Sequence, residues 1–150
     1  MTCTFFGHKD TPGSVKDKLR EAIINLIELS GVDMFYVGTH GSFDRMAASI
    51  LQELTGIYPN IDYRIVLAYL PNNKNKDDLV NLEKTEFPEG IETAPKRFAI
   101  DFRNRWMLMR ADTVVAYVSH DWGGAAKFVQ LAERKQLPVL NLFNTLNKLK

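Results

Sequence analysis

Strand-like and helix-like segments alternate along most of this chain. Short runs rich in β-branched and aromatic residues predict strands at 2–6, 33–37, 63–70, 113–118 and 139–142. Apolar residues at helical spacing predict helices between them, at 14–30, 46–54, 97–110 and 125–134. Each helix can return the chain to begin another parallel strand. The alternation therefore predicts an α/β fold, a Rossmann-like three-layer arrangement with a mostly parallel sheet flanked by helices.

Length and composition narrow the class of protein. The 150 residues are enough for one domain with its own core, so 1–150 is expected to fold as a single unit. The formal net charge is +1, whereas proteins that bind duplex DNA or anionic membranes usually carry a strong basic excess. The longest apolar runs, 65–70 and 114–118, are too short to span a bilayer. We therefore expect a cytoplasmic protein without a membrane partner, and the charge does not favour a nucleic-acid partner.

Local signals add detail near the N-terminus. The lone cysteine, Cys3, lies in an apolar run, which predicts a core residue in a reducing compartment. Ser14 and Asp17 have the spacing of a capping box at the start of the first helix. Gly31 is placed to cap the end of that helix.

The helix predicted at 97–110 is unusually apolar. Its core-facing stripe comprises Phe98, Phe102, Trp106 and Met109. Residues 106–109 place apolar atoms around more of the helix than one stripe needs, which predicts a homodimer contact. Burial under the preceding segment, 77–96, is the alternative. That segment has a poor pattern, which favours a short helix at 79–82 and a short strand at 90–93.

Ligands of parallel sheets bind outside the carboxyl ends of the strands. The loops to consider are 7–13, 38–44, 119–124 and the stretch from 71 onward. All three histidines, His8, His40 and His120, lie within three residues of a predicted strand end. They are expected at one edge of the sheet, where they could converge on a catalytic centre or a metal. No cysteine or second carboxylate accompanies them at ligand spacing, so neither a metal nor another cofactor is predicted.

Two glycine-containing loops lie where a strand gives way to a helix. They read Gly38-Thr39-His40-Gly41-Ser42-Phe43-Asp44 and Trp122-Gly123-Gly124-Ala125-Ala126. Glycine permits close backbone approach, and the free N–H groups at a helix start bind anions. Either loop could simply turn the chain, but two loops at the same crevice favour phosphate binding. Neither matches the dinucleotide-binding fingerprint or the P-loop.

Charged side chains near these loops extend the hypothesis. Arg103 could grip a phosphate with two parallel hydrogen bonds, although most arginines on a helix are simply solvated. Asp44 and Asp101 are the acids close enough to be considered for a ribose hydroxyl. Each of the two acids could equally be a helix cap or a surface charge.

In these pieces and their order the chain resembles the SLOG superfamily, which includes the Lonely guy phosphoribohydrolases and the Smf/DprA proteins. The resemblance is to small stand-alone bacterial members and covers most of the chain, at 3–9, 38–44, 103–107, 111–115 and 123–125. It implies a nucleotide pocket at the strand ends, often in a homodimer. The ligand-binding residues expected from the loops and the resemblance are Gly7, His8, Lys9, Gly38, Thr39, His40, Gly41, Asp44, Arg103, Gly123, Gly124 and Ala125.

One departure from the family pattern decides which function is favoured. The phosphoribohydrolase branch cleaves an N-glycosidic bond with an arginine that Arg103 matches and a glutamate three residues after a Gly-Thr pair. Here Gly124 is followed by neither the threonine nor any acid before Glu133. We therefore expect a sensor or sequestering module for a nucleotide-derived ligand, such as an ADP-ribose-type signal, without efficient catalysis.

Two alternatives remain open. The first is an N-glycoside hydrolase acting on a nucleotide, in which His8 or His40 takes over acid–base work. The second is single-stranded DNA binding, as in the Smf branch, which needs a basic groove.

Overall fold

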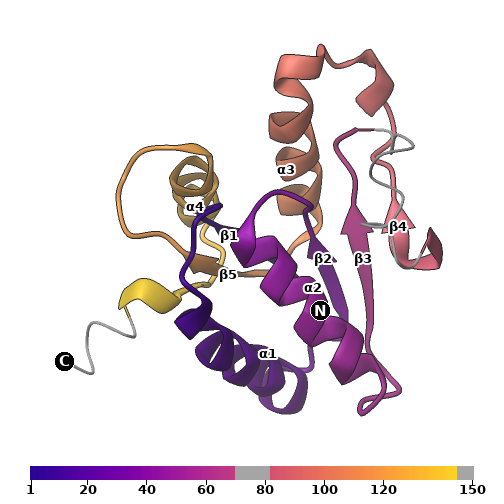
Figure 1. Ribbon diagram of the computed structural model, residues 1–150, viewed down its shortest axis with the longest axis vertical. Coiled ribbons are helices and arrows are strands. Elements are labelled where there is room, and N and C mark those ends of the chain that lie inside the picture. The colour runs from indigo at the N-terminus through magenta and orange to yellow at the C-terminus, as the bar shows by residue number, and fades with distance from the viewer. Residues whose placement is uncertain (70–81, 145–150) are drawn as a thin grey trace.

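The predicted alternation is confirmed by the computed structural model, which describes residues 1–69 and 82–144. Six strands form one sheet in the order β4-β3-β2-β1-β5-β6, and all their pairings are parallel. The strands are β1 (Thr2–Gly7), β2 (Met34–Val37), β3 (Asp62–Val66), β4 (Thr85–Glu86), β5 (Thr113–Tyr117) and β6 (Val139–Asn141). The main helices are α1 (Lys16–Ser30), α2 (Ser42–Thr55), α3 (Ala99–Arg110) and α4 (Gly124–Arg134). Figure 1 shows these helices packed around the sheet.

The direction of winding changes at β1. From β1 the chain proceeds through β2 to β3, then crosses back by way of α3 to place β5 on the other side of β1. Thr4 of β1 therefore aligns with Tyr36 on one side and with Val114 on the other. Loops that leave β1 and β5 diverge at such a point and open a crevice at the carboxyl ends of the strands.

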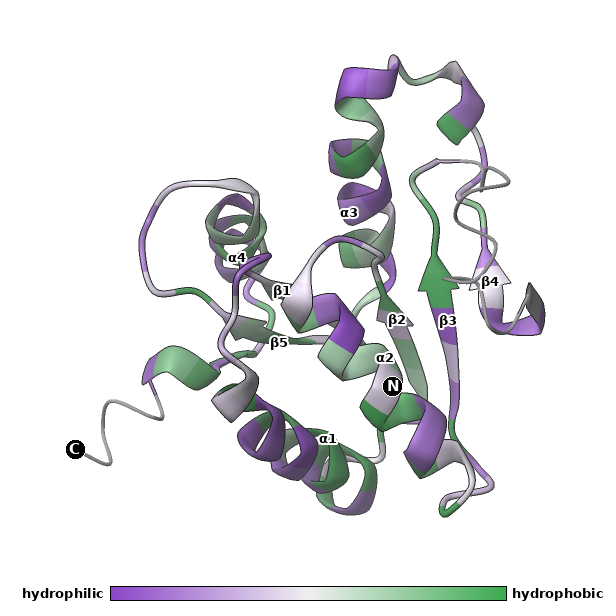
Figure 2. Cartoon of the chain, viewed as in Figure 1, coloured by the Kyte–Doolittle hydropathy of each residue, from purple (hydrophilic) through white to green (hydrophobic). Residues whose placement is uncertain are grey.

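Two hydrophobic clusters cover the faces of the sheet. Cys3 and Phe5 pack with α1 and α2, whereas Phe6 packs with α3 and α4. Successive residues of a strand point to opposite faces, which explains the division. Figure 2 shows hydrophobic strands between helices that each carry a hydrophilic side. The prediction that Cys3 is a core residue is confirmed, because its side chain is fully buried and burial raises the pKa of its thiol.

The ends of α1 confirm one cap and correct another. Gly31 has a φ of +71° directly after the helix, as predicted for a glycine cap. The predicted capping box is wrong, because Val15 precedes α1 and no side chain caps the helix. Ser14 belongs instead to a short 3-10 helix, Gly13–Val15.

The segment around α3 also differs from the prediction. The strand expected at 90–93 is instead a 3-10 helix, Ile91–Thr93, and strand β4 precedes it in the chain. Most of the helix expected at 79–82 falls outside the described residues. A further 3-10 turn, Lys96–Phe98, precedes α3.

The core-facing stripe of α3 is displaced from the predicted one. Its buried residues are Ala99, Arg103, Met107 and Leu108. Phe98 and Met109, placed in the stripe by spacing, are 51% and 72% exposed. The spacing of apolar residues predicted the wrong stripe because an arginine, Arg103, occupies the centre of the buried face. Since Met107 and Leu108 are covered within the subunit, less apolar surface remains for the homodimer contact, which stays a prediction.

Among the described residues, no helix has the length and apolar character needed to cross a membrane.

Close contact between β1 and α2 yields a stability prediction. A Cβ added at Gly7 would lie 2.2 Å from Cγ of Phe43, whose side chain is fully buried. Gly7→Ala should therefore lower the free energy of unfolding by about 1–3 kcal/mol in chemical denaturation, because the core must shift to admit it. Gly13→Ala is the matched control, since nothing lies within 4 Å of a Cβ there. Equal stabilities of the two variants would contradict the contact.

Candidate functional site

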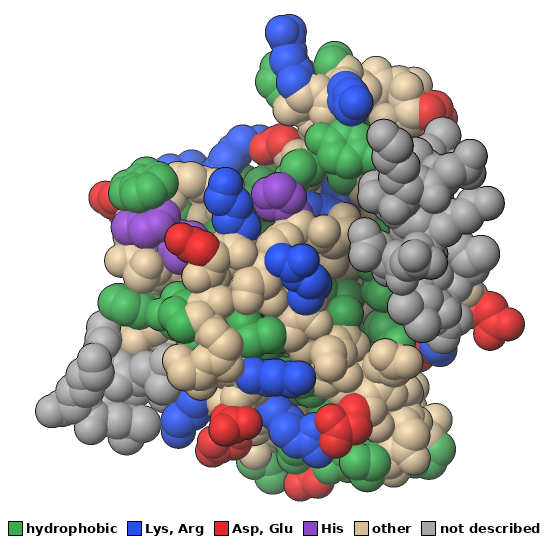
Figure 3. Space-filling model, in the orientation of Figure 1, with side chains coloured by type: hydrophobic (Ala, Val, Ile, Leu, Met, Phe, Trp, Pro, Cys, Tyr) green, Lys and Arg blue, Asp and Glu red, His purple; other side chains and the backbone are tan. Residues whose placement is uncertain are grey.

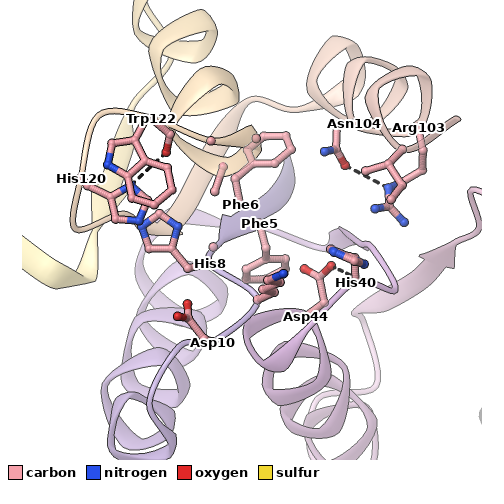
Figure 4. A pocket seen from close by; sticks show the side chains of 16 residues that line it. Phe5, Phe6, His8, Asp10, His40, Asp44, Arg103, Asn104, His120 and Trp122 are labelled. Carbon is pink, nitrogen blue, oxygen red and sulfur yellow. Dashed lines mark hydrogen bonds between the residues drawn. The ribbon is translucent and has the colours of Figure 1, made fainter. Parts of the chain in front are cut away.

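A pocket of about 380 Å³ opens where the winding direction changes. Its walls come from the end of β1, the loop after β2, α3, and the loop that joins β5 to α4 (Figure 4). The predicted site residues among its lining are Gly7, His8, Lys9, His40, Asp44, Arg103, Gly123, Gly124 and Ala125. Segments distant in sequence thus meet in a volume typical of small-molecule sites.

The other predicted residues, Gly38, Thr39 and Gly41, are not among the residues that line the pocket. A Cβ on Gly38 would be 2.8 Å from Oδ2 of Asp44 and 2.9 Å from Cζ of Arg103. Gly41 has a φ of +94°, and a Cβ there would lie 2.3 Å from the Cα of Lys9. These glycines admit neighbouring protein atoms on the side where a Cβ would lie. That a ligand approaches their backbone stays a prediction.

Arg103 is the most deeply buried charged residue of the site, with 1% of its surface exposed. Its Nε donates to Oδ1 of Asn104 (2.9 Å), and its Nη1 donates to Oγ1 of Thr39 (3.2 Å) and to the carbonyl of Val66 (3.1 Å). Nη2 has no partner among the described residues, where no buried side-chain nitrogen or oxygen lacks one. Nη2 is therefore not fully enclosed, and Arg103 is one of the residues that line the pocket.

Asp44 faces the same space from the first turn of α2 and is 8% exposed. Its Oδ2 accepts a hydrogen bond from the backbone N–H of His40 at 2.9 Å. Burial raises the pKa of Asp44 to about 6, although Arg103 and that N–H both favour the charged form. Burial also lowers the pKa of Arg103, against the opposing effect of Asp44. The pocket thus holds a cation and an acid that both lose hydration.

Asp101, the other acid considered for a ribose, lies outside the pocket lining. Its carboxylate accepts hydrogen bonds from Arg105 (2.7 Å) and from Lys127 of α4 (2.5 Å). These contacts tie α3 to α4. They account for Asp101 as a structural residue.

The first turn of α4 forms the opposite wall. Gly123, with a φ of +94°, directly precedes helix α4. The first N–H groups of this helix receive no side-chain cap, and its first turn contains no acidic residue. Nothing lies within 4 Å of a Cβ added at Gly124. Free N–H groups and the helix dipole make this end attractive to anions.

Two of the three histidines come together. The rings of His8 and His120 stack with centroids 3.9 Å apart, and His120 stacks on Trp122 at 3.7 Å. Nε2 of His8 accepts a hydrogen bond from the backbone N–H of Ser119 at 3.0 Å, so its proton resides on Nδ1. Burial and the charge of His120 lower the pKa of His8, which favours this neutral form. His40 lines the pocket without joining the stack.

Within the described part of the chain, no group of three His, Cys, Asp or Glu residues could hold a metal ion.

Several lining residues are not among the expected ligand-binding residues. They are Phe5, Phe6, Asp10, Ile100, Asn104, His120 and Trp122. His120 was expected at this edge of the sheet with the other histidines, and a tryptophan beside a glycine pair is the sequence signal that could have added Trp122. Phe5 and Phe6 belong to a buried strand, where aromatic residues are expected for packing alone.

The fold and the site define an α/β protein whose pocket lies at the crossover of a parallel sheet. Comparison with protein-family models and with curated proteins finds no match for this chain. Membership of the SLOG superfamily therefore stays a prediction.

Burial of Asp44 leads to a test of stability against pH. Its folded-state pKa of about 6 exceeds its ordinary value of 3.8, so stability is lost as the pH rises through this interval. Asp44→Asn removes the charge and keeps an acceptor for His40. It should be about 1–3 kcal/mol more stable than the native protein at pH 8 and nearly equal to it at pH 4, by chemical denaturation.

A second acid gives the opposite sign as a control. The pKa of Asp62 is lowered, because hydrogen bonds from Lys84, Arg64 and a backbone N–H outweigh the raising effect of burial. Asp62→Asn should therefore lose stability at pH 8. If Asp44→Asn also lost stability there, attraction to Arg103 would outweigh the cost of burial.

Proposed function

We propose that the pocket binds a nucleotide or nucleotide-derived ligand, such as an ADP-ribose-type molecule, for sensing or sequestration. The observation that carries the proposal is the buried guanidinium of Arg103, which lines the pocket and whose Nη2 has no partner among the described residues. Burying a cation costs free energy. This cost is lowest when a bound anion accepts further hydrogen bonds from the cation. The SLOG-like order of loops supports the same conclusion.

A phosphate fits between two donor groups of the pocket. Arg103 approaches from α3, and the N–H groups of Gly124 and Ala125 approach from the start of α4. A guanidinium donates two parallel hydrogen bonds to a phosphate, and helix N–H groups add weaker donors along the dipole. Together they hold a phosphate by its oxygens without a metal.

A ribose fits beside Asp44 and Asn104. Oδ1 of Asp44 has no partner among the described residues, and it accepts hydrogen bonds from sugar hydroxyls. The NH2 group of Asn104 has no partner among the described residues, because Arg103 uses only the side-chain oxygen. A sugar phosphate therefore matches both the charged and the neutral polar groups of this wall.

A second candidate function, hydrolysis of an N-glycosidic bond, is favoured by one observation. Asp44 has a pKa of about 6, within the range in which a carboxyl group exchanges protons near neutral pH. Asp44 is the buried carboxyl group among the lining residues, whereas the first turn of α4 has no acid. Release of free base from AMP by the pure protein distinguishes this enzyme from a binding module.

Single-stranded DNA binding receives less support. It needs a basic groove, and the pocket pairs Lys9 and Arg103 with the acids Asp10 and Asp44. Figure 3 shows lysine and arginine side chains separated by other types on this face of the described chain.

Arg103→Lys tests the phosphate contact. An ammonium keeps the charge and loses the paired geometry, so affinity for ADP-ribose should fall about ten- to a hundredfold by calorimetry, equivalent to about 1.5–3 kcal/mol. Arg105→Lys on the same helix is the control, because Arg105 contacts Asp101 outside the lining. Equal dissociation constants for native protein and Arg103→Lys would remove Arg103 from the site. Mass spectrometry of molecules released on denaturation identifies a co-purified ligand.

Gly124→Val tests the helix end. The branched side chain enters open space, so the melting temperature should stay close to that of the native protein while ADP-ribose binding is abolished. Gly13→Val is a matched control, since its Cβ also meets nothing within 4 Å and it lies outside the pocket lining. A melting temperature that collapsed together with binding would show that Gly124 has a structural role.

A further inference from the structure

Three aromatic rings form a continuous stack at one side of the pocket. His8 lies parallel to His120 within 17°, and His120 lies parallel to Trp122 within 14°. Figure 4 shows the stack across the pocket from Arg103 and Asn104. We call these three residues the aromatic stack.

Hydrogen bonds restrain the two histidine rings of the aromatic stack. Ser119 donates its N–H to Nε2 of His8, and Nδ1 of His120 donates to the carbonyl of Trp122 at 2.9 Å. At the inner end, Tyr117 of β5 meets His8 edge-on, with an angle of 88° between the rings. These contacts restrain the imidazole rings of His8 and His120, on which Trp122 stacks, before any ligand arrives, and such restraint lowers the entropic cost of binding beside them.

The outer end of the aromatic stack is uncovered. Trp122 is 68% exposed although it lines the pocket. An exposed indole leaves a large apolar surface in water, and burying it is favourable. A flat ring laid on Trp122 would continue the stack.

We propose that the aromatic stack is a subsite for a planar aromatic base, which packs on Trp122 as the next ring. This inference rests on the proposed function, which places the phosphate at α4 and Arg103. Trp122 directly precedes Gly123 and Gly124, so neighbouring residues hold the base and the phosphate of one ligand. Bases stack on aromatic side chains largely irrespective of sequence, so the subsite recognises the class of ligand.

Three probes separate the base from the phosphate: AMP, adenosine, which lacks the phosphate, and ribose 5-phosphate, which lacks the base. AMP should bind more tightly than either of the others by calorimetry. Trp122→Ala should weaken AMP binding about ten- to a hundredfold and leave ribose 5-phosphate binding unchanged. Trp122→Phe, which keeps a smaller ring, should recover part of the loss.

The fluorescence of Trp122 supplies a second readout, which would not respond to AMP if Trp122 only held its loop in position. Trp106→Phe leaves Trp122 as the sole tryptophan, and AMP should quench its emission whereas ribose 5-phosphate should not. Equal binding of AMP and ribose 5-phosphate would overturn the base subsite and leave the phosphate proposal standing. Equal affinities for AMP and adenosine, with quenching of the Trp122 emission, would overturn the phosphate proposal and leave the base subsite standing. Absence of binding by all three, or equal losses for AMP and ribose 5-phosphate in Trp122→Ala, would also overturn the subsite.

Discussion

Burial of the Arg103 guanidinium is the interaction around which the polar side of the pocket is organised. A charge with 1% exposure is tolerated only when hydrogen bonds replace water, and the carbonyl of Val66, the hydroxyl of Thr39 and the amide of Asn104 supply them. The carbonyl is available because Val66 is the last residue of β3. Gly38 leaves the space in which the guanidinium and Asp44 approach each other.

The two sides of the pocket differ in chemistry. The side formed by α3 and the start of α2 presents a cation, an acid and an amide, which suit phosphate and sugar. The side formed by the ends of β1 and β5 presents His8, His120 and Trp122, which suit a flat ring. Between them, the N–H groups of α4 face the pocket with no acid in the first turn of the helix. This division between the two sides is the basis of our proposal that the pocket binds a nucleotide.

The pattern of strands and helices was predictable because each element has its own periodicity. β1, β2 and β5 were recognised within a residue or two of their observed bounds, and the glycine cap at Gly31 followed from local chemistry. Predictions failed where tertiary contacts outweighed local preference. On α3 the buried face is centred on Arg103, whereas the spacing of apolar residues predicts Phe98 and Met109 on that face. At 90–93 a 3-10 turn replaces the expected strand.

The sequence by itself determined the α/β class, the loops at the carboxyl edge, and most residues that line the pocket, because alternation and glycine placement are local properties. The tertiary structure alone decided which glycines are packed against protein atoms. Gly38 and Gly41 are close to protein atoms, whereas Gly124 is open, and the packing of distant segments causes this difference. It also decided that His8 stacks on His120 and that His40 stands apart. Such pairings depend on strand order, since only the placement of β1 beside β5 brings residues 8 and 120 together.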